Sequence, residues 1–171
     1  MDMLATPVTL SREEILRRAK GKGGLLGRLF VRQPLTELRL EYVRFYMVRL
    51  PYDVEARRFP FRRHETGGVM SVAVNALYGR CAMKDTELAL APVQGGHFQN
   101  GRFEMAGGEA EELAMNFARR IIMRMCRNLP RFGAVEHETF FRPYWMAYYG
   151  DPESQDTRYL PFEADGLTFK R

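Results

Sequence analysis

The chain has 171 residues, of which 46% are hydrophobic and 12% aromatic, so it can bury a core and does not have the composition of a disordered polymer. Its formal net charge is +5, and 22 of its 26 basic residues are arginine. No apolar run approaches the roughly 20 residues that cross a bilayer, and the start lacks the pattern of a secretion signal, so we predict a cytoplasmic protein that does not bind membranes.

The first predicted element is a helix that follows a flexible start at residues 1–8. Ser11 stands three residues before Glu14, which is the spacing of a capping box, and Ile15 and Ala19 follow at helical intervals. The glycines that come next make continuation of the helix unfavourable.

Two strands are predicted after this helix. Leu38, Leu40 and Tyr42 alternate with charged residues, which is the two-residue period of a half-buried strand. A second strand begins near Val69. The segment between them reads RRFPFRRHETGG, residues 57–68, and it concentrates arginine around Phe-Pro-Phe.

A hairpin and a long helix are predicted in the middle of the chain. Asn100-Gly101 is a preferred pair for a tight hairpin turn. The helix runs from about residue 109 to 128, with glutamates at its start and Arg124 and Arg127 at its end, where they complement the helix dipole. Its predicted core stripe recurs every four residues at Leu113, Phe117, Ile121, Met125 and Leu129, and Ala114, Ala118 and Ile122 widen it.

The last third of the chain predicts a strand and a second hairpin. The strand VEHETFFRPYWMAYYG contains Pro143, which lacks a backbone donor, so we expect an edge position or a bulge there. The hairpin turns at Asp165-Gly166.

An offset of 98 residues aligns the two predicted helix starts and two aromatic strands, and it matches Arg44 to Arg142 and Tyr46 to Tyr144. We therefore predict an α+β fold, in which two related helix-plus-antiparallel-sheet units, products of an internal duplication, form one compact domain. The units are residues 9–92 and 107–171, with a connecting hairpin at 93–106.

The arginine segment is the main candidate for binding an anion or a protein partner. Its residues of interest are Arg57, Arg58, Phe59, Phe61, Arg62, Arg63 and His64. In a nucleic-acid complex the arginines contact phosphates and the phenylalanines stack on bases. A solvated loop, or an arginine-rich composition that reflects codon usage alone, explains the same residues without a ligand.

An enzyme is the third alternative, with a site assembled from His97, Glu104, His137 and the paired arginines Arg44 and Arg142. The known phosphate-loop and nucleophile-elbow spacings do not occur, and the histidines and two cysteines match no metal-binding spacing. We therefore predict no cofactor and no metal. Tyr46, Tyr144 and Trp145 belong to an aromatic surface or to the core.

From the sequence we predict a non-catalytic binding or assembly module of the bacterial-type cytoplasmic class. The expected partner is a protein, including a second copy of the chain in a homo-oligomer; the segment GDPESQD supplies acidic residues that the arginine segment of a neighbouring copy could contact. The alternatives are single-stranded RNA or DNA, or another polyanion, bound through the Arg/Phe loop, and the enzyme described above. The sequence does not identify a small ligand.

Overall fold

A computed structural model describes residues 3–21, 34–58, 62–84, 87–93, 97–98, 105–151 and 158–167, with backbone alone at residues 20–21, 56–58 and 62–66. The elements within these ranges are β1 (Leu4–Ala5), α1 (Arg12–Gly21), β2 (Leu35–Arg58), β3 (Arg62–Asn75), β4 (Cys81–Met83), β5 (Ala91–Pro92), β6 (His97–Phe98), α3 (Gly107–Cys126), β7 (Arg131–Phe132), β8 (Glu136–Tyr149) and β9 (Arg158–Glu163).

The described strands belong to one mixed sheet with the order β4-β3-β2-β8-β1-β5, to which β6 and β7 are added beside β2 and β9 beside β8. The β1–β8 and β2–β6 pairs are parallel, whereas β2–β3, β3–β4 and β8–β9 are antiparallel. Strands make up 50% of the described residues and helices 23%. The predicted α+β fold of two helix-plus-antiparallel-sheet units is therefore wrong, because one large mixed sheet dominates the protein.

The physical reason for this error is the length of β2. Alternation of apolar and polar residues indicates a strand locally, but it does not show that a single strand, β2, continues for 24 residues. Contacts between residues group the chain into two units: Met1–Val43, Ala89–Gln99 and Phe141–Thr168 form the first, and Arg44–Leu88, Asn100–Phe140 and Phe169–Arg171 form the second. β2 and β8 each contribute residues to both units.

The first unit contains α1, and its N-terminus confirms the predicted cap. The Glu14 backbone N–H donates to Ser11 Oγ at 3.2 Å, which satisfies one of the free donors at the start of the helix. Ile15 and Ala19 are buried on the helix face that packs on the sheet. They share an apolar cluster with Leu38, Ala147, Tyr149 and Phe162.

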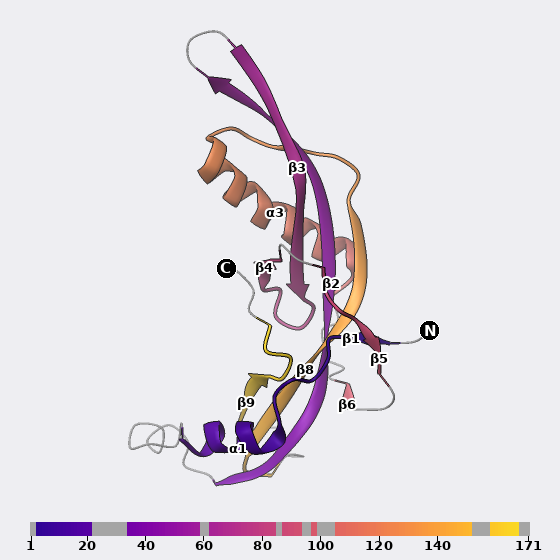
Figure 1. Ribbon diagram of the computed structural model, residues 1–171, viewed down its shortest axis with the longest axis vertical. Coiled ribbons are helices and arrows are strands. Elements are labelled where there is room, and N and C mark those ends of the chain that lie inside the picture. Colours follow the sequence, from indigo (N-terminus) through magenta and orange to yellow (C-terminus); the bar gives the residue numbers. More distant parts are fainter. Residues whose placement is uncertain are drawn as a thin grey trace. The chain divides into compact units, whose positions relative to one another are not determined.

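The second unit contains α3, which packs along β2 and β3 (Figure 1). The helix lies where it was predicted, and its fully buried line is the one that Ala114, Ala118 and Ile122 add to the predicted stripe, whereas the far end of the stripe is exposed. The fully buried positions are Ala110, Ala114, Ala118 and Ile122, spaced four residues apart. Met125 is 70% exposed and Leu129 66% exposed. Small alanine side chains allow the helix backbone to approach the sheet closely, so larger apolar residues flank the contact instead of filling it.

The predictions for Pro143 and for the turns at residues 165–166 and 100–101 have different outcomes. β8 is unbroken and Pro143 is fully buried, with β8 between β2 and β1 in the strand order, so the edge prediction is wrong. The Pro143 carbonyl accepts the Ala164 N–H at 3.0 Å, so the residue keeps its acceptor bond. β9 pairs with β8, and the chain turns after it with Gly166 at φ 65°. The Asn100-Gly101 turn lies outside the described residues.

Candidate functional site

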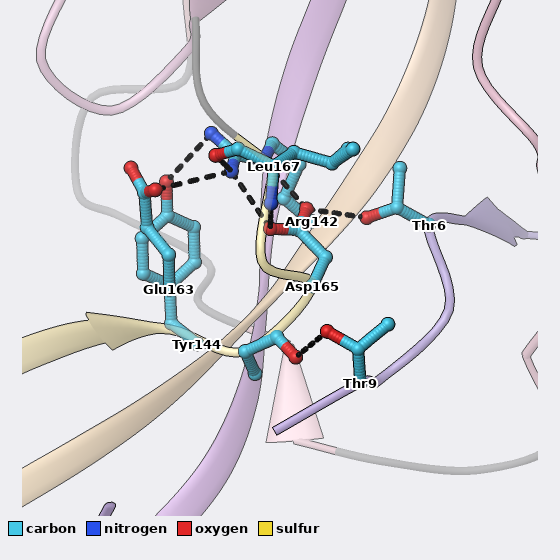
Figure 2. A network of polar contacts seen from close by, with 8 residues as sticks. Thr6, Thr9, Arg142, Tyr144, Glu163, Asp165 and Leu167 are labelled. Atoms are coloured by element: carbon cyan, nitrogen blue, oxygen red, sulfur yellow. Dashed lines mark hydrogen bonds and ion pairs between the residues drawn. The ribbon is translucent and has the colours of Figure 1, made fainter.

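Arg142, one of the two strand arginines identified in the sequence, is buried in the first unit. Its side chain is 3% exposed and that of Asp165 is 0% exposed. Arg142 Nε donates to Asp165 Oδ2 and Nη2 donates to Oδ1, both at 2.8 Å, which is a bidentate ion pair (Figure 2). Nη2 also donates to the Leu167 carbonyl at 3.2 Å. These bonds join β8 to the turn that follows β9.

Three further side chains complete this network (Figure 2). The Thr6 hydroxyl donates to Asp165 Oδ2 at 2.8 Å. The Tyr144 hydroxyl lies 3.4 Å from Arg142 Nη1, and its ring lies beneath the guanidinium with 5.6 Å between the Arg142 Cζ and the ring centroid. Glu163, with a half-exposed side chain, approaches Arg142 Nη2 at 3.5 Å. Residues in or next to β1, β8 and β9 therefore contribute to one network around the Arg142 guanidinium.

The environment of this pair keeps both partners ionised. Burial opposes the charge of Asp165, but the hydrogen bonds and charge of Arg142, helped by Thr6 and Leu167, outweigh burial and hold the pKa of that carboxyl below its usual value. For Arg142, burial likewise opposes the charge, and Asp165 holds the pKa above its usual value. Burial raises the pKa of Tyr144 to about 12. Because its own chain already supplies the carboxylate that Arg142 binds, we interpret the network as structural.

The other paired arginine and the aromatic residues have separate surroundings. Arg44 lies on β2 in the second unit, half-buried, and its carbonyl accepts the Ala76 N–H at 3.0 Å. Tyr46 is 6% exposed and donates its hydroxyl to the Met105 carbonyl at 2.8 Å. Trp145, half-buried in the first unit, donates from Nε1 to the Leu10 carbonyl at 3.1 Å. Tyr46 and Trp145 therefore pack into the interior of their units.

The residues of the enzyme hypothesis do not assemble a described site. His137, in the second unit, is bound through Nδ1 to Glu111 Oε1 at 2.6 Å, and its ring meets the Tyr46 ring edge-on with 5.5 Å between centroids. His97 lies on β6 in the first unit, and Glu104 lies outside the described residues. Within the described ranges, no group of three or more His, Cys, Asp or Glu side chains has the geometry to hold a metal.

The arginine segment forms the end of a two-stranded antiparallel ribbon in the second unit. The backbone register pairs Arg57 with Arg63 and Arg58 with Arg62, directly across the two strands. We call residues 54–58 and 62–66 the arginine ribbon. β7 meets β2 at positions 52–53 and β4 meets β3 at positions 72–74, and both pairings lie outside the ribbon. Phe59 and Phe61 lie outside the described residues, as do the side chains of Arg57, Arg58, Arg62, Arg63 and His64.

The end of α3 lies beside the base of the arginine ribbon. The Asn128 side chain donates to the Glu55 carbonyl, and Arg131 approaches the Glu55 carboxylate at 3.5 Å. In Figure 1, β2 and β3 continue past this end of the helix. Arg124 and Arg127 are exposed on the last helical turn and at its cap. Sequence reasoning assigned them only to the helix dipole, although basic residues recur through this stretch at Arg119, Arg120, Arg124, Arg127 and Arg131.

A hollow of about 600 Å³ lies where the helix end meets β2. It is lined by Asp53, Val54, Glu55, Asn128, Leu129, Pro130 and Arg131. Two carboxylates line it, and the nearest guanidinium already approaches one of them, so its electrostatics do not favour a phosphate.

Arg127 has a backbone conformation that L-residues seldom adopt. It caps α3 with φ 56° and ψ 19°, and its N–H donates to the Met123 carbonyl at 2.9 Å. Among the described residues, it is the one non-glycine residue with positive φ. Glycine is common at this cap because it lacks the Cβ that makes the left-handed region unfavourable. Arginine at this position therefore adopts a backbone conformation that is less favourable for it than for glycine.

Replacing Arg127 with glycine is expected to raise the free energy of unfolding by about 0.5–1 kcal/mol, because relief of the left-handed strain exceeds the extra entropy of glycine in the unfolded chain. Urea denaturation followed by circular dichroism measures the change. Arg124→Gly removes the same charge within the helix and should lower stability by about 0.5–1 kcal/mol. If both variants shift stability downward, the left-handed conformation of Arg127 is not costly.

Comparison of the chain with protein-family models, curated proteins and solved structures yields no match. None of the helices in the described part of the chain is both long and apolar enough to span a bilayer.

Proposed function

We propose that the protein is a non-catalytic binding module whose partner is a nucleic acid, held through its phosphodiester backbone by the arginine ribbon. The observation that supports this proposal is the strand register, in which Arg57 is opposite Arg63 and Arg58 is opposite Arg62. Directly opposed residues of an antiparallel pair have Cβ atoms only about 4.5–5.5 Å apart, and like charges at that distance destabilise the pair. Bound phosphates relieve this repulsion.

The residue type and its position are consistent with a phosphate ligand. Arginine carries a planar fork of donors that binds phosphate oxygens in pairs. The ribbon extends about 13 Å from position 54 to position 58, at a rise of about 3.3 Å per residue. That reach spans several phosphates, because duplex DNA carries one charge per about 1.7 Å of its axis. The net charge of +5 adds a weak long-range attraction.

The test is fluorescence anisotropy with labelled mixed-sequence RNA and DNA, single- and double-stranded, at 50, 100 and 200 mM salt, the working range of such titrations. We expect binding that weakens steeply with salt. Changing Arg57, Arg58, Arg62 and Arg63 together to alanine should weaken it by at least about 10-fold at about 100 mM salt, and each phosphate contact that is lost reduces the slope of log K against log salt by about 0.9.

A matched control separates recognition from net charge. Changing Arg12, Arg17, Arg18 and Arg158 to alanine removes the same four charges from exposed positions on α1 and β9. This control should retain affinity within about threefold, since the proposal assigns no phosphate contact to these four positions. Equal losses in the two variants, or no binding by the wild type to any of these nucleic acids, would show that the proposal is wrong. Elution volume at each salt concentration identifies self-association of the protein.

A further inference from the structure

The two faces of the arginine ribbon differ in charge. Side chains alternate between the faces of a strand, and paired residues share a face. Val54 is 1% exposed and belongs to the core cluster that α3 covers, so even-numbered positions of β2 and their β3 partners lie on the helix side of the sheet. Beyond Val54, this side carries Arg58 paired with Arg62, and Ala56 paired with His64. It contains no acidic position.

The opposite face is balanced in charge. Its odd-numbered positions pair Arg57 with Arg63 and Glu55 with Glu65, so two arginines occupy a face with two glutamates. Asp53, the next odd-numbered position toward the body of the unit, adds a third carboxylate. A phosphate that approaches this face meets acidic and basic positions together. Attraction is therefore concentrated on the helix side.

The end of α3 extends the basic face beyond the ribbon itself. The helix lies on the same side of the sheet as positions 58 and 62, and the Asn128 and Arg131 contacts place its C-terminal end beside Glu55. Arg124 and Arg127 are exposed there. The C-terminus of a helix carries the equivalent of about −0.5 charge, which repels an anion, but two arginines outweigh that partial charge.

We infer that the nucleic-acid site is one-sided: a phosphodiester backbone lies on the helix-side face of the arginine ribbon, in contact with Arg58 and Arg62, and continues onto Arg124 and Arg127 at the end of α3. The inference rests on the proposed function and identifies the face that performs it. Charge complementarity identifies the ligand class, because the helix-side positions of the ribbon beyond Val54 include two arginines and no acidic residue, and Arg124 and Arg127 are exposed at the end of the helix on that side. Single strands and duplexes share this backbone chemistry.

Four double variants test the site, and each removes two positive charges: R58A/R62A, R124A/R127A, R57A/R63A, and the α1 control R12A/R17A. Anisotropy with a labelled single strand and with the duplex of the same sequence measures each affinity at about 100 mM salt. Each phosphate contact contributes about 0.9 decade at that salt concentration, so R58A/R62A and R124A/R127A should each lose up to about 60-fold. R57A/R63A and R12A/R17A should lose less than about threefold.

The outcomes are distinguishable. A loss in R57A/R63A as large as that in R58A/R62A would show that both faces bind, which overturns the one-sided site but not the proposed function. Unchanged affinity in R124A/R127A would overturn the extension onto α3. Failure of the wild type to bind either probe overturns both proposals. Comparison of the two probes establishes whether the backbone belongs to a single strand or a duplex, and circular dichroism checks that each variant is folded.

Discussion

Replacing Asp165 with alanine is expected to lower the free energy of unfolding by about 3–5 kcal/mol, because the Arg142 guanidinium is then left buried without its carboxylate. Thr6, whose hydroxyl donates to the same carboxylate, also loses its acceptor. For a chain of this size each kcal/mol corresponds to roughly 2–4 °C, so the melting temperature should fall by about 6–20 °C. Thermal and urea denaturation measure the loss.

Glu163→Ala is the control for this prediction. Glu163 approaches Arg142 at 3.5 Å, but its side chain is 50% exposed, and a solvent-screened pair contributes at most about 1 kcal/mol. A loss in Asp165→Ala no greater than that in Glu163→Ala would contradict the assignment of the buried pair as a structural anchor. Nucleic-acid affinity of the folded variant should remain unchanged, since this network lies in the first unit and the arginine ribbon in the second.

The same pair gives the protein a sensitivity to acid. The pKa of Asp165 is held below its value in the unfolded chain, which is about 3.9. Its stabilising contribution is therefore complete above that unfolded-state pKa and is lost as the pH falls through the lower folded-state pKa. The stability difference between wild type and Asp165→Ala should accordingly narrow below about pH 4. A constant difference across the acid range would mean that the carboxylate charge contributes little.

Replacing Leu50 with alanine is expected to cost about 2–5 kcal/mol, since Leu50 is 0% exposed in the core cluster beneath α3 and its removal leaves a cavity. Leu129→Ala is the matched control. Leu129 is 66% exposed, although the sequence pattern assigned it to the core, and its truncation should change stability by no more than about 0.5 kcal/mol. Urea denaturation of both variants provides the comparison. Similar losses of stability in the two variants would indicate that Leu129 is buried in the core, as the sequence pattern predicted.

Local chemistry was readable from the sequence where it depends on neighbouring residues. Ser11 caps α1 because a hydroxyl three residues before an amide can reach it in any helix of this kind. The position of α3 was equally clear from its periodicity. Its buried face was only partly clear, because Ala114, Ala118 and Ile122 belong to the predicted stripe but Met125 and Leu129, at the C-terminal end of that stripe, are exposed. Close approach to the sheet selects small residues, and that distance is a tertiary property.

The candidate site was predictable in part for the same reason. The arginines of residues 57–63 were identified from composition alone, but their register and faces depend on the pairing of β2 with β3. The contribution of Arg124 and Arg127 depends on where α3 ends relative to Glu55, a contact between residues more than 70 positions apart. Arg142 illustrates the opposite case. The sequence pattern made Arg142 a candidate for binding a ligand, whereas its burial and its ion pair with Asp165 indicate a structural role.

The two-stranded arginine ribbon also bears on how the protein avoids aggregation. β7 and β4 pair with β2 and β3 at positions 52–53 and 72–74, so neither of these strands covers the outer edges of the ribbon. Exposed edges of this kind recruit strands from other molecules, and natural proteins limit such pairing by placing charged residues along them. Arg57, Arg58, Arg62 and Arg63 would make two copies of the ribbon repel one another when aligned edge to edge. The four arginines proposed to bind an anion would thus also disfavour edge-to-edge pairing between two copies of the ribbon.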